Sequence, residues 1–107
     1  MPACSEFHIT SALSGRYLAS STMKKRDFRD TFYYLSGCLY TLFSLRDDRL
    51  LNGEQVQATF SGVIQRLAKQ KGAYNIRLIL MQLNETYRQI GEAAMALVVE
   101  KIQQAME

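Results

Sequence analysis

The sequence has few of the residues on which zinc sites, disulfide scaffolds and low-complexity chains depend. Its 107 residues include two cysteines, Cys4 and Cys38, and one histidine, His8. A structural zinc site needs four Cys or His ligands at short paired spacings, so no metal site is expected. A disulfide between Cys4 and Cys38 remains an alternative, although a disulfide-dense secreted scaffold uses more cysteines. With one proline and six glycines, the chain is neither collagen-like nor of low complexity.

Motifs of the common enzyme and nucleotide-binding sites are missing as well. The sequence contains no glycine loop for phosphate groups and no Gly-x-Ser-x-Gly elbow. One histidine near the chain start provides no convincing Ser/His/Asp or Cys/His set. Acids Asp47, Asp48 and Glu54 flank an expected turn, where solvation explains them better than acid–base catalysis. We therefore expect a chain that is not an enzyme, with no cofactor and no small-molecule substrate.

Targeting and membrane segments are also not predicted. The first residues lack a basic region followed by an apolar stretch, so no signal peptide is expected and cytoplasmic residence is the default. Residues 31–45 form an uncharged run of 15 residues, whereas a membrane-spanning helix needs about 20. A buried helix explains this run better, and Cys38 within it is expected to be a buried, inert hydrophobe.

What the chain does contain is enough apolar material for one folded domain. Apolar residues make up 48% of the sequence and charged residues 21%, which is typical of a globular domain with a single core. The predicted fold class is all-α, a small up-and-down bundle of three to four helices. Residues 23–107 are expected to form this bundle, and residues 1–22 an N-terminal arm that is irregular or β-like, with helical spacing around Tyr17 as the alternative.

Two helices are predicted from apolar stripes at helical spacing. Residues 21–45 carry a stripe of Phe28, Phe32, Leu35, Leu39 and Leu42, which repeats in steps of four and three. A second helix follows Asn52, which with Gln55 three residues later has the pattern of a capping box. Its stripe consists of Val56, Phe60, Val63 and Leu67, and Gly72 is expected just past its end.

The segment of residues 73–105 has the most regular pattern. Its apolar residues step by four and three in a heptad-like seam of Ile76, Leu80, Leu83, Tyr87, Ile90, Ala94 and Leu97. The stretch 78–81 is apolar nearly all round, so this part should be central. One helix of this length would span about 45 Å, more than a compact chain of this size is wide. Part of it would then need a second protein or a second copy as cover, unless Asn84 and Glu85 cap a new helix.

These stripes suggest a protein-interaction module, such as a small regulator, adaptor or chaperone, acting on a protein partner or as a homodimer. The expected interface consists of apolar and aromatic residues from the first and last helical segments, namely Tyr33, Tyr40, Phe43, Leu83, Tyr87, Ile90 and Leu97.

Two small pairs, Ser36-Gly37 and Ser61-Gly62, interrupt apolar helices, where glycine costs about 1 kcal/mol relative to alanine. Such a glycine either forms a socket for a partner's side chain or is tolerated core spacing.

A nucleic-acid-binding regulator is the alternative, because the net charge of +3 is concentrated in short basic groups. The basic residues concerned are Lys24, Lys25, Arg26, Arg29, Lys69 and Lys71. The first group is diluted by Asp27 and Asp30, which weakens the nucleic-acid interpretation. It also falls near the positive end of the first helix dipole, where acids are preferred. Either that helix begins nearer Asp27, or an acidic partner binds the basic group.

Overall fold

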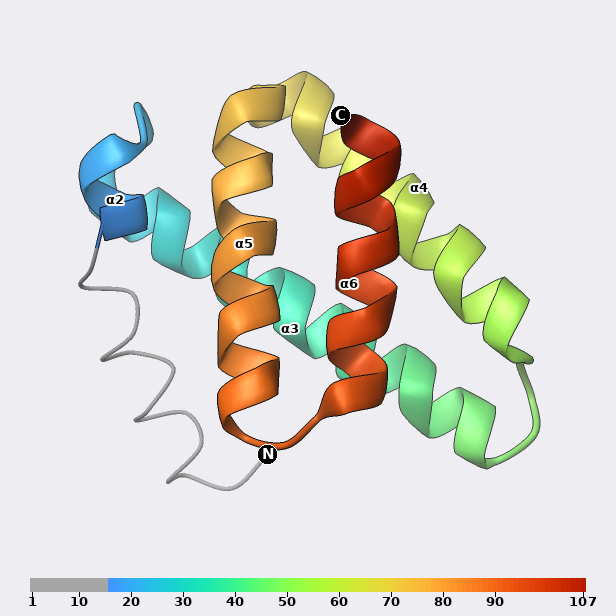
Figure 1. Cartoon of the computed structure of the whole chain (residues 1–107). Helices are drawn as coiled ribbons and strands as arrows, with labels where there is room; N and C mark the ends of the chain where they lie inside the picture. Colours follow the sequence, from blue (N-terminus) through green and yellow to red (C-terminus); the bar gives the residue numbers. More distant parts are fainter. Residues whose placement is uncertain (1–15) are drawn as a thin grey trace.

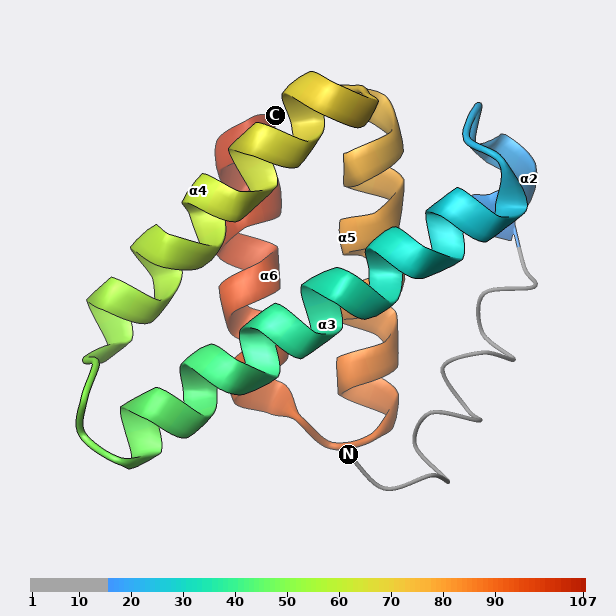
Figure 2. The same cartoon turned by 180° about the vertical axis from the view of Figure 1, so that it is seen from behind.

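Five helices make up the part of the chain that the structure, a computed structural model, describes, namely residues 16–107. They are α2 (Arg16–Ser20), α3 (Lys25–Asp47), α4 (Gly53–Lys71), α5 (Ala73–Gln89) and α6 (Ala93–Met106). No strand occurs among these residues, so the all-α prediction is confirmed. Helices α3 and α4 form one antiparallel hairpin and α5 and α6 another (Figure 1). The two hairpins are stacked as two layers, and Figure 2 shows the α3/α4 layer in front.

Helices α3 and α4 form largely where the sequence predicts them. The five residues of the α3 stripe are all buried. The capping box at the start of α4 is present, because Asn52 Oδ1 accepts a hydrogen bond from the Gln55 backbone N–H (2.9 Å) and Gln55 Oε1 accepts one from Asn52 (2.8 Å). Gly72 ends α4 with φ of 96°, a left-handed conformation that favours glycine. The α4 stripe differs, because Ile64 is buried while Val63 is only half-buried.

The single long helix expected over residues 73–105 is wrong, and so is the alternative break at Asn84 and Glu85. The chain reverses at Gly91, whose φ is 80°. Backbone N–H groups of Glu92 and Gly91 donate to the carbonyls of Tyr87 (2.8 Å) and Arg88 (3.3 Å), the hydrogen bonds of a Schellman motif. This reversal folds α6 back along α5, so most of the apolar surface of the segment is covered within the chain. The length argument for a second chain therefore no longer holds.

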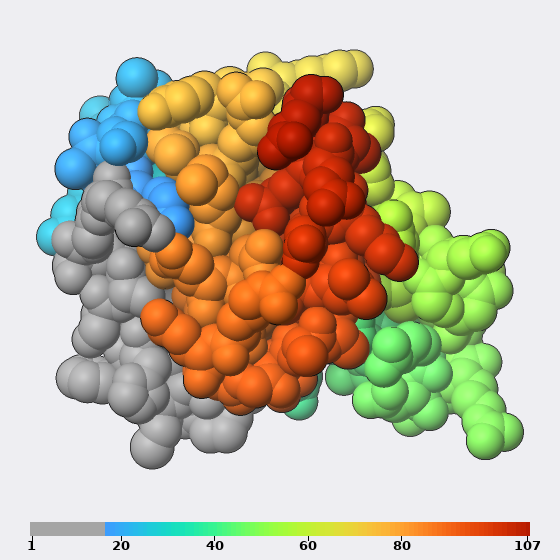
Figure 3. All heavy atoms as spheres, viewed as in Figure 1, coloured from blue at the N-terminus to red at the C-terminus, as the bar shows by residue number. Residues whose placement is uncertain are grey.

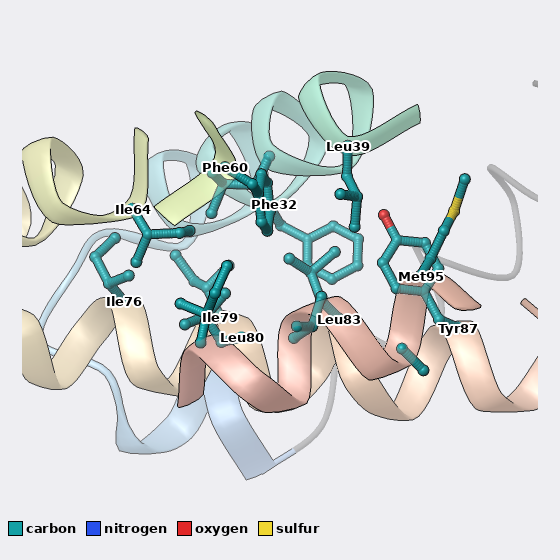
Figure 4. Packing of buried hydrophobic residues seen from close by; sticks show 14 of the residues in the cluster. Phe32, Leu39, Phe60, Ile64, Ile76, Ile79, Leu80, Leu83, Tyr87 and Met95 are labelled. Atoms are coloured by element: carbon teal, nitrogen blue, oxygen red, sulfur yellow. The ribbon is translucent and has the colours of Figure 1, made fainter. Parts of the chain in front are cut away.

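The core lies between the two layers. Figure 4 shows Phe32 of α3, Phe60 of α4 and Leu83 of α5 pointing toward one another, and each has an exposed fraction of 0%. Helix α5 contacts every other described helix, which confirms its predicted central position. The Tyr87 hydroxyl donates a hydrogen bond to Ser36 Oγ (3.2 Å), so a buried polar contact also joins α5 to α3.

Hydrogen bonds hold the N-terminal part of the described chain against α5. Of the arm predicted over residues 1–22, residues 1–15 lie outside the described residues, and residues 16–20 form the short helix α2. Tyr17 is buried, and its hydroxyl donates a hydrogen bond to Glu85 Oε1 (2.8 Å). Asn75 Oδ1 accepts from Ser21 Oγ (3.0 Å) and from the Thr22 backbone N–H (3.2 Å). These bonds place the start of α3 beside the start of α5.

Candidate interaction groove

The residues predicted as an interface do not gather on one surface. Phe43, Leu83 and Tyr87 are buried inside the single chain, so as surface contacts these three predictions are wrong. Leu83 and Tyr87 belong to the core because α5 is enclosed by the other described helices, and Phe43 joins the same core cluster from α3. Tyr33 and Ile90 are half-buried. Tyr40 (53% exposed) and Leu97 (50% exposed) are accessible, but they lie on α3 and α6, in different layers.

A groove instead lies between α3 and α4, on their side that faces away from α5 and α6. Its apolar part has a volume of about 530 Å³. Six residues of α3 and two of α4 line it, namely Tyr33, Tyr34, Gly37, Cys38, Thr41, Leu42, Thr59 and Val63. Tyr34, Gly37 and Thr41 are exposed, so this part is open to solvent. No charged side chain lines it.

Gly37 and Gly62 lie in the middle of these two helices, and the described residues 16–107 give neither of them a packing reason. A Cβ atom added at either position would meet no described side chain or neighbouring helix within 4 Å. Neither glycine has a positive φ, so helical backbone geometry does not require glycine there. The interpretation as tolerated core spacing is therefore wrong, because Gly37 is exposed and Gly62 half-buried. Gly37 instead lines the apolar part of the groove.

The groove continues toward the start of α3 and the end of α4 as a charged part of about 400 Å³. Tyr34 and Val63 line both parts, which makes the groove continuous. In the charged part Lys71 Nζ donates to Asp27 Oδ1 at 3.0 Å, a bond that joins α4 to α3. Asp30, Arg66 and Gln70 also line this part.

The fold brings together the six basic residues of the nucleic-acid alternative. Lys24, Lys25, Arg26 and Arg29 lie at the start of α3, and Lys69 and Lys71 at the end of α4. The bond between Lys71 and Asp27 shows that these two helix ends are adjacent. Helix α3 begins at Lys25, with Lys24 as an N-cap that makes no side-chain capping bond. The suggested start nearer Asp27 is therefore wrong, and the basic residues do lie at the positive end of the helix dipole.

Tyr34 lies where the two parts of the groove meet. It is 55% exposed. A hydrogen bond with Cys38 and the charge on Cys38 raise the pKa of the Tyr34 hydroxyl, while the positive charge of Arg66 lowers it. Cys38 is a free thiol and is half-buried rather than fully buried as predicted.

The residues that could bind a metal ion do not gather in the described part of the chain. Cys4 and His8 lie outside the described residues. Residues 16–107 contain no group of three His, Cys, Asp or Glu side chains that could hold a metal ion.

Sequence reasoning found only part of this groove. The interface predicted from the sequence includes Tyr33, and a socket at Gly37 is one of two alternatives there, whereas Cys38, Thr41 and Val63 are not among the predicted interface residues. A pattern indicates this face, since Tyr34, Cys38 and Thr41 follow one another in steps of four and three on the face beside the core stripe. The uncharged run of residues 31–45 thus has one face in the core and one in the groove.

Comparison with known proteins finds no relative for this chain. No protein-family model matches the sequence, and neither the curated proteins nor the solved structures contain a significant match. Among the described helices, none is both long and apolar enough to cross a membrane. Any function must therefore be argued from the groove and its charges.

Proposed function

We propose that this chain is a non-enzymatic protein-interaction module that binds a helix, from a partner or from a second copy, in the α3/α4 groove. The observation that carries this proposal is Gly37, an exposed glycine in the interior of α3 that no packing contact among the described residues requires. Glycine at such a position lowers helix stability by about 1 kcal/mol relative to alanine. A bound side chain occupying the space above Gly37 supplies a reason for this cost.

The composition of the groove fits helix-in-groove recognition. Tyr34 offers an exposed ring, which contributes large contact area at a low cost in side-chain entropy. Cys38 and Val63 add half-buried apolar surface that a partner would cover completely. Amphipathic helices bind such grooves through apolar anchors spaced three and four residues apart. The roles of regulator, adaptor or chaperone are all compatible with this form of binding.

Filling the groove provides the test. A neutral amphipathic peptide of about 18 residues, with leucines on one face and glutamines elsewhere, serves as the probe. The Gly37→Met variant places a flexible apolar side chain in the groove and should weaken probe binding at least about tenfold, by fluorescence anisotropy. The matched control is Ala94→Met, at an exposed position on α6 in the other layer. Equal binding by both variants and the wild type would refute the proposed function.

Self-association requires its own measurement. Light scattering gives the solution mass of the wild type and of Gly37→Met at matched concentrations. If a second copy occupies the groove, the wild type is a dimer and Gly37→Met is a monomer with unchanged helix content. A wild-type monomer that binds the probe peptide assigns the groove to a different protein.

Nucleic acid binding is the second candidate, favoured by the six basic residues at one end of the α3/α4 layer. Contacts with phosphates would give retention on DNA or RNA that weakens steeply as salt rises. Absence of retention at low salt would rule this candidate out.

A further inference from the structure

The charge of the molecule is unevenly distributed along the α3/α4 layer. Residues 24–30 and 66–71, here called the basic end, contain seven basic and two acidic side chains. All other residues together contain six basic and eight acidic ones. The net charge of +3 is thus the balance of +5 at the basic end and −2 elsewhere. Most of the residues that line the charged part of the groove belong to the basic end, and they include Arg66 and Lys71.

Most of these cations have no acidic partner among the described residues 16–107. The two acids at the basic end are already engaged, Asp27 with Lys71 (3.0 Å) and Asp30 with Arg26 (3.9 Å). The remaining five make no ion pair with any residue of the range 16–107, namely Lys24, Lys25, Arg29, Arg66 and Lys69. Cations at the start of a helix also oppose its dipole, so Lys24 and Lys25 stand where acids are favoured.

We infer that the occupant of the groove is an acidic amphipathic helix, whose apolar side chains lie over Gly37 and whose carboxylates lie against the basic end. This inference rests on the proposed function. Arg66 is the cation best placed for a carboxylate, because it lines the charged part and has no ion pair among residues 16–107. Lys24, the N-cap of α3 one turn before Asp27, is a second such cation at the same end. Charge complementarity of this kind selects partners and accelerates their association.

A second copy of this chain lacks the charge to take this place. The opposite end of the α3/α4 hairpin, residues 46–54, contains three acids and two arginines, a net charge of −1. An antiparallel pair would bring this end against the basic end of the other copy and leave most of the +5 uncompensated. A distinct acidic partner therefore fits better than a homodimer.

A nucleic acid also fits the geometry less well than an acidic helix. The apolar part is continuous with the charged part and offers no cation to a phosphate. An amphipathic helix uses both parts at once.

The experiment compares two versions of the leucine-bearing probe peptide, one with glutamates beside its apolar face and one with lysines. At about 0.02 M salt, the glutamate peptide should bind at least about tenfold more tightly than the lysine peptide, and this preference should shrink by about 0.3 M salt. In Lys24→Glu/Arg66→Glu the preference should disappear or reverse. Arg77→Glu/Lys101→Glu changes the net charge equally at exposed positions that do not line the groove, and should retain the preference.

The other outcomes separate this inference from the proposed function. If both peptides bind equally and Gly37→Met weakens both, the inference of an acidic partner is overturned, while the groove remains a binding site. If Gly37→Met leaves peptide binding unchanged, the groove is not the binding site, and the proposed function is overturned as well. Tighter binding of a short single-stranded DNA than of the glutamate peptide, unaffected by Gly37→Met, would assign the basic end to nucleic acid and overturn the inference.

Discussion

Replacement of Gly37 by alanine should stabilise the isolated chain. Gly37 lies in the interior of the 23-residue helix α3, it is exposed, and an added Cβ meets no described side chain or neighbouring helix within 4 Å. The gain in helix propensity is therefore not offset by a clash, and it amounts to about 1 kcal/mol in the free energy of unfolding. For a domain of this size, 1 kcal/mol corresponds to a rise of about 4–8 °C in Tm.

Urea denaturation followed by circular dichroism measures this change directly, with thermal unfolding as a second readout. Gly62→Ala is the matched variant, since Gly62 is also in a helix interior with open space around a Cβ, and it should raise the midpoint in the same direction. A lower midpoint for Gly37→Ala would show that the folded chain itself requires glycine there. The argument that Gly37 serves a partner would then fail.

Three further predictions concern the core and the reversal between α5 and α6. Burial raises the pKa of Tyr87 to about 12, partly offset by the hydrogen bond with Ser36. Because the folded pKa is higher than the unfolded value, stability is fully present below pH 10 and falls by roughly 2–3 kcal/mol between about pH 10 and 12. Tyr87→Phe should flatten this loss in urea titrations across that range, and an unchanged pH slope would contradict the assignment. Gly91→Ala should lower the free energy of unfolding by about 1 kcal/mol or more in the same urea assay, because φ of 80° strains any residue with a Cβ. An unchanged free energy of unfolding would contradict the observed turn. Leu83→Asp should abolish the helical circular dichroism spectrum, because the new carboxylate would be buried in the core. The control Leu97→Asp, at an exposed position, should fold normally. A folded Leu83→Asp chain would show that Leu83 does not belong to the core.

Much of the fold was predictable because local chemistry determines it. The α3 stripe repeats without interruption, and the capping box at Asn52 and the glycine at position 72 specify both ends of α4. The break at Gly91 was not predicted, because the heptad-like seam continues across it. Both α5 and α6 present an apolar face to the core, so the spacing of apolar residues does not reveal that the chain has reversed. A glycine within such a seam is the one local indication of that reversal.

The candidate groove was less predictable than the fold. The sequence pattern predicts Leu83 and Tyr87 at an interface, because a single long helix would leave part of their seam uncovered. Tyr34 and Val63 become neighbours only when α3 and α4 pack as a hairpin, and no spacing along the chain indicates that contact. The adjacency of the two basic groups likewise depends on the tertiary contact between Lys71 and Asp27. Figure 3 shows the opposite face, where α5 and α6 cover the core.

The most direct test of the central claim is a titration of the isotope-labelled chain with the glutamate probe peptide, followed by amide chemical shifts. A helix bound in the α3/α4 groove should cause its largest shifts at Tyr34, Gly37, Cys38 and Val63, with smaller ones at Arg66 in the charged part. Shifts concentrated on the exposed face of α6 around Leu97, or no shifts at a saturating peptide concentration, would contradict the groove as the binding site.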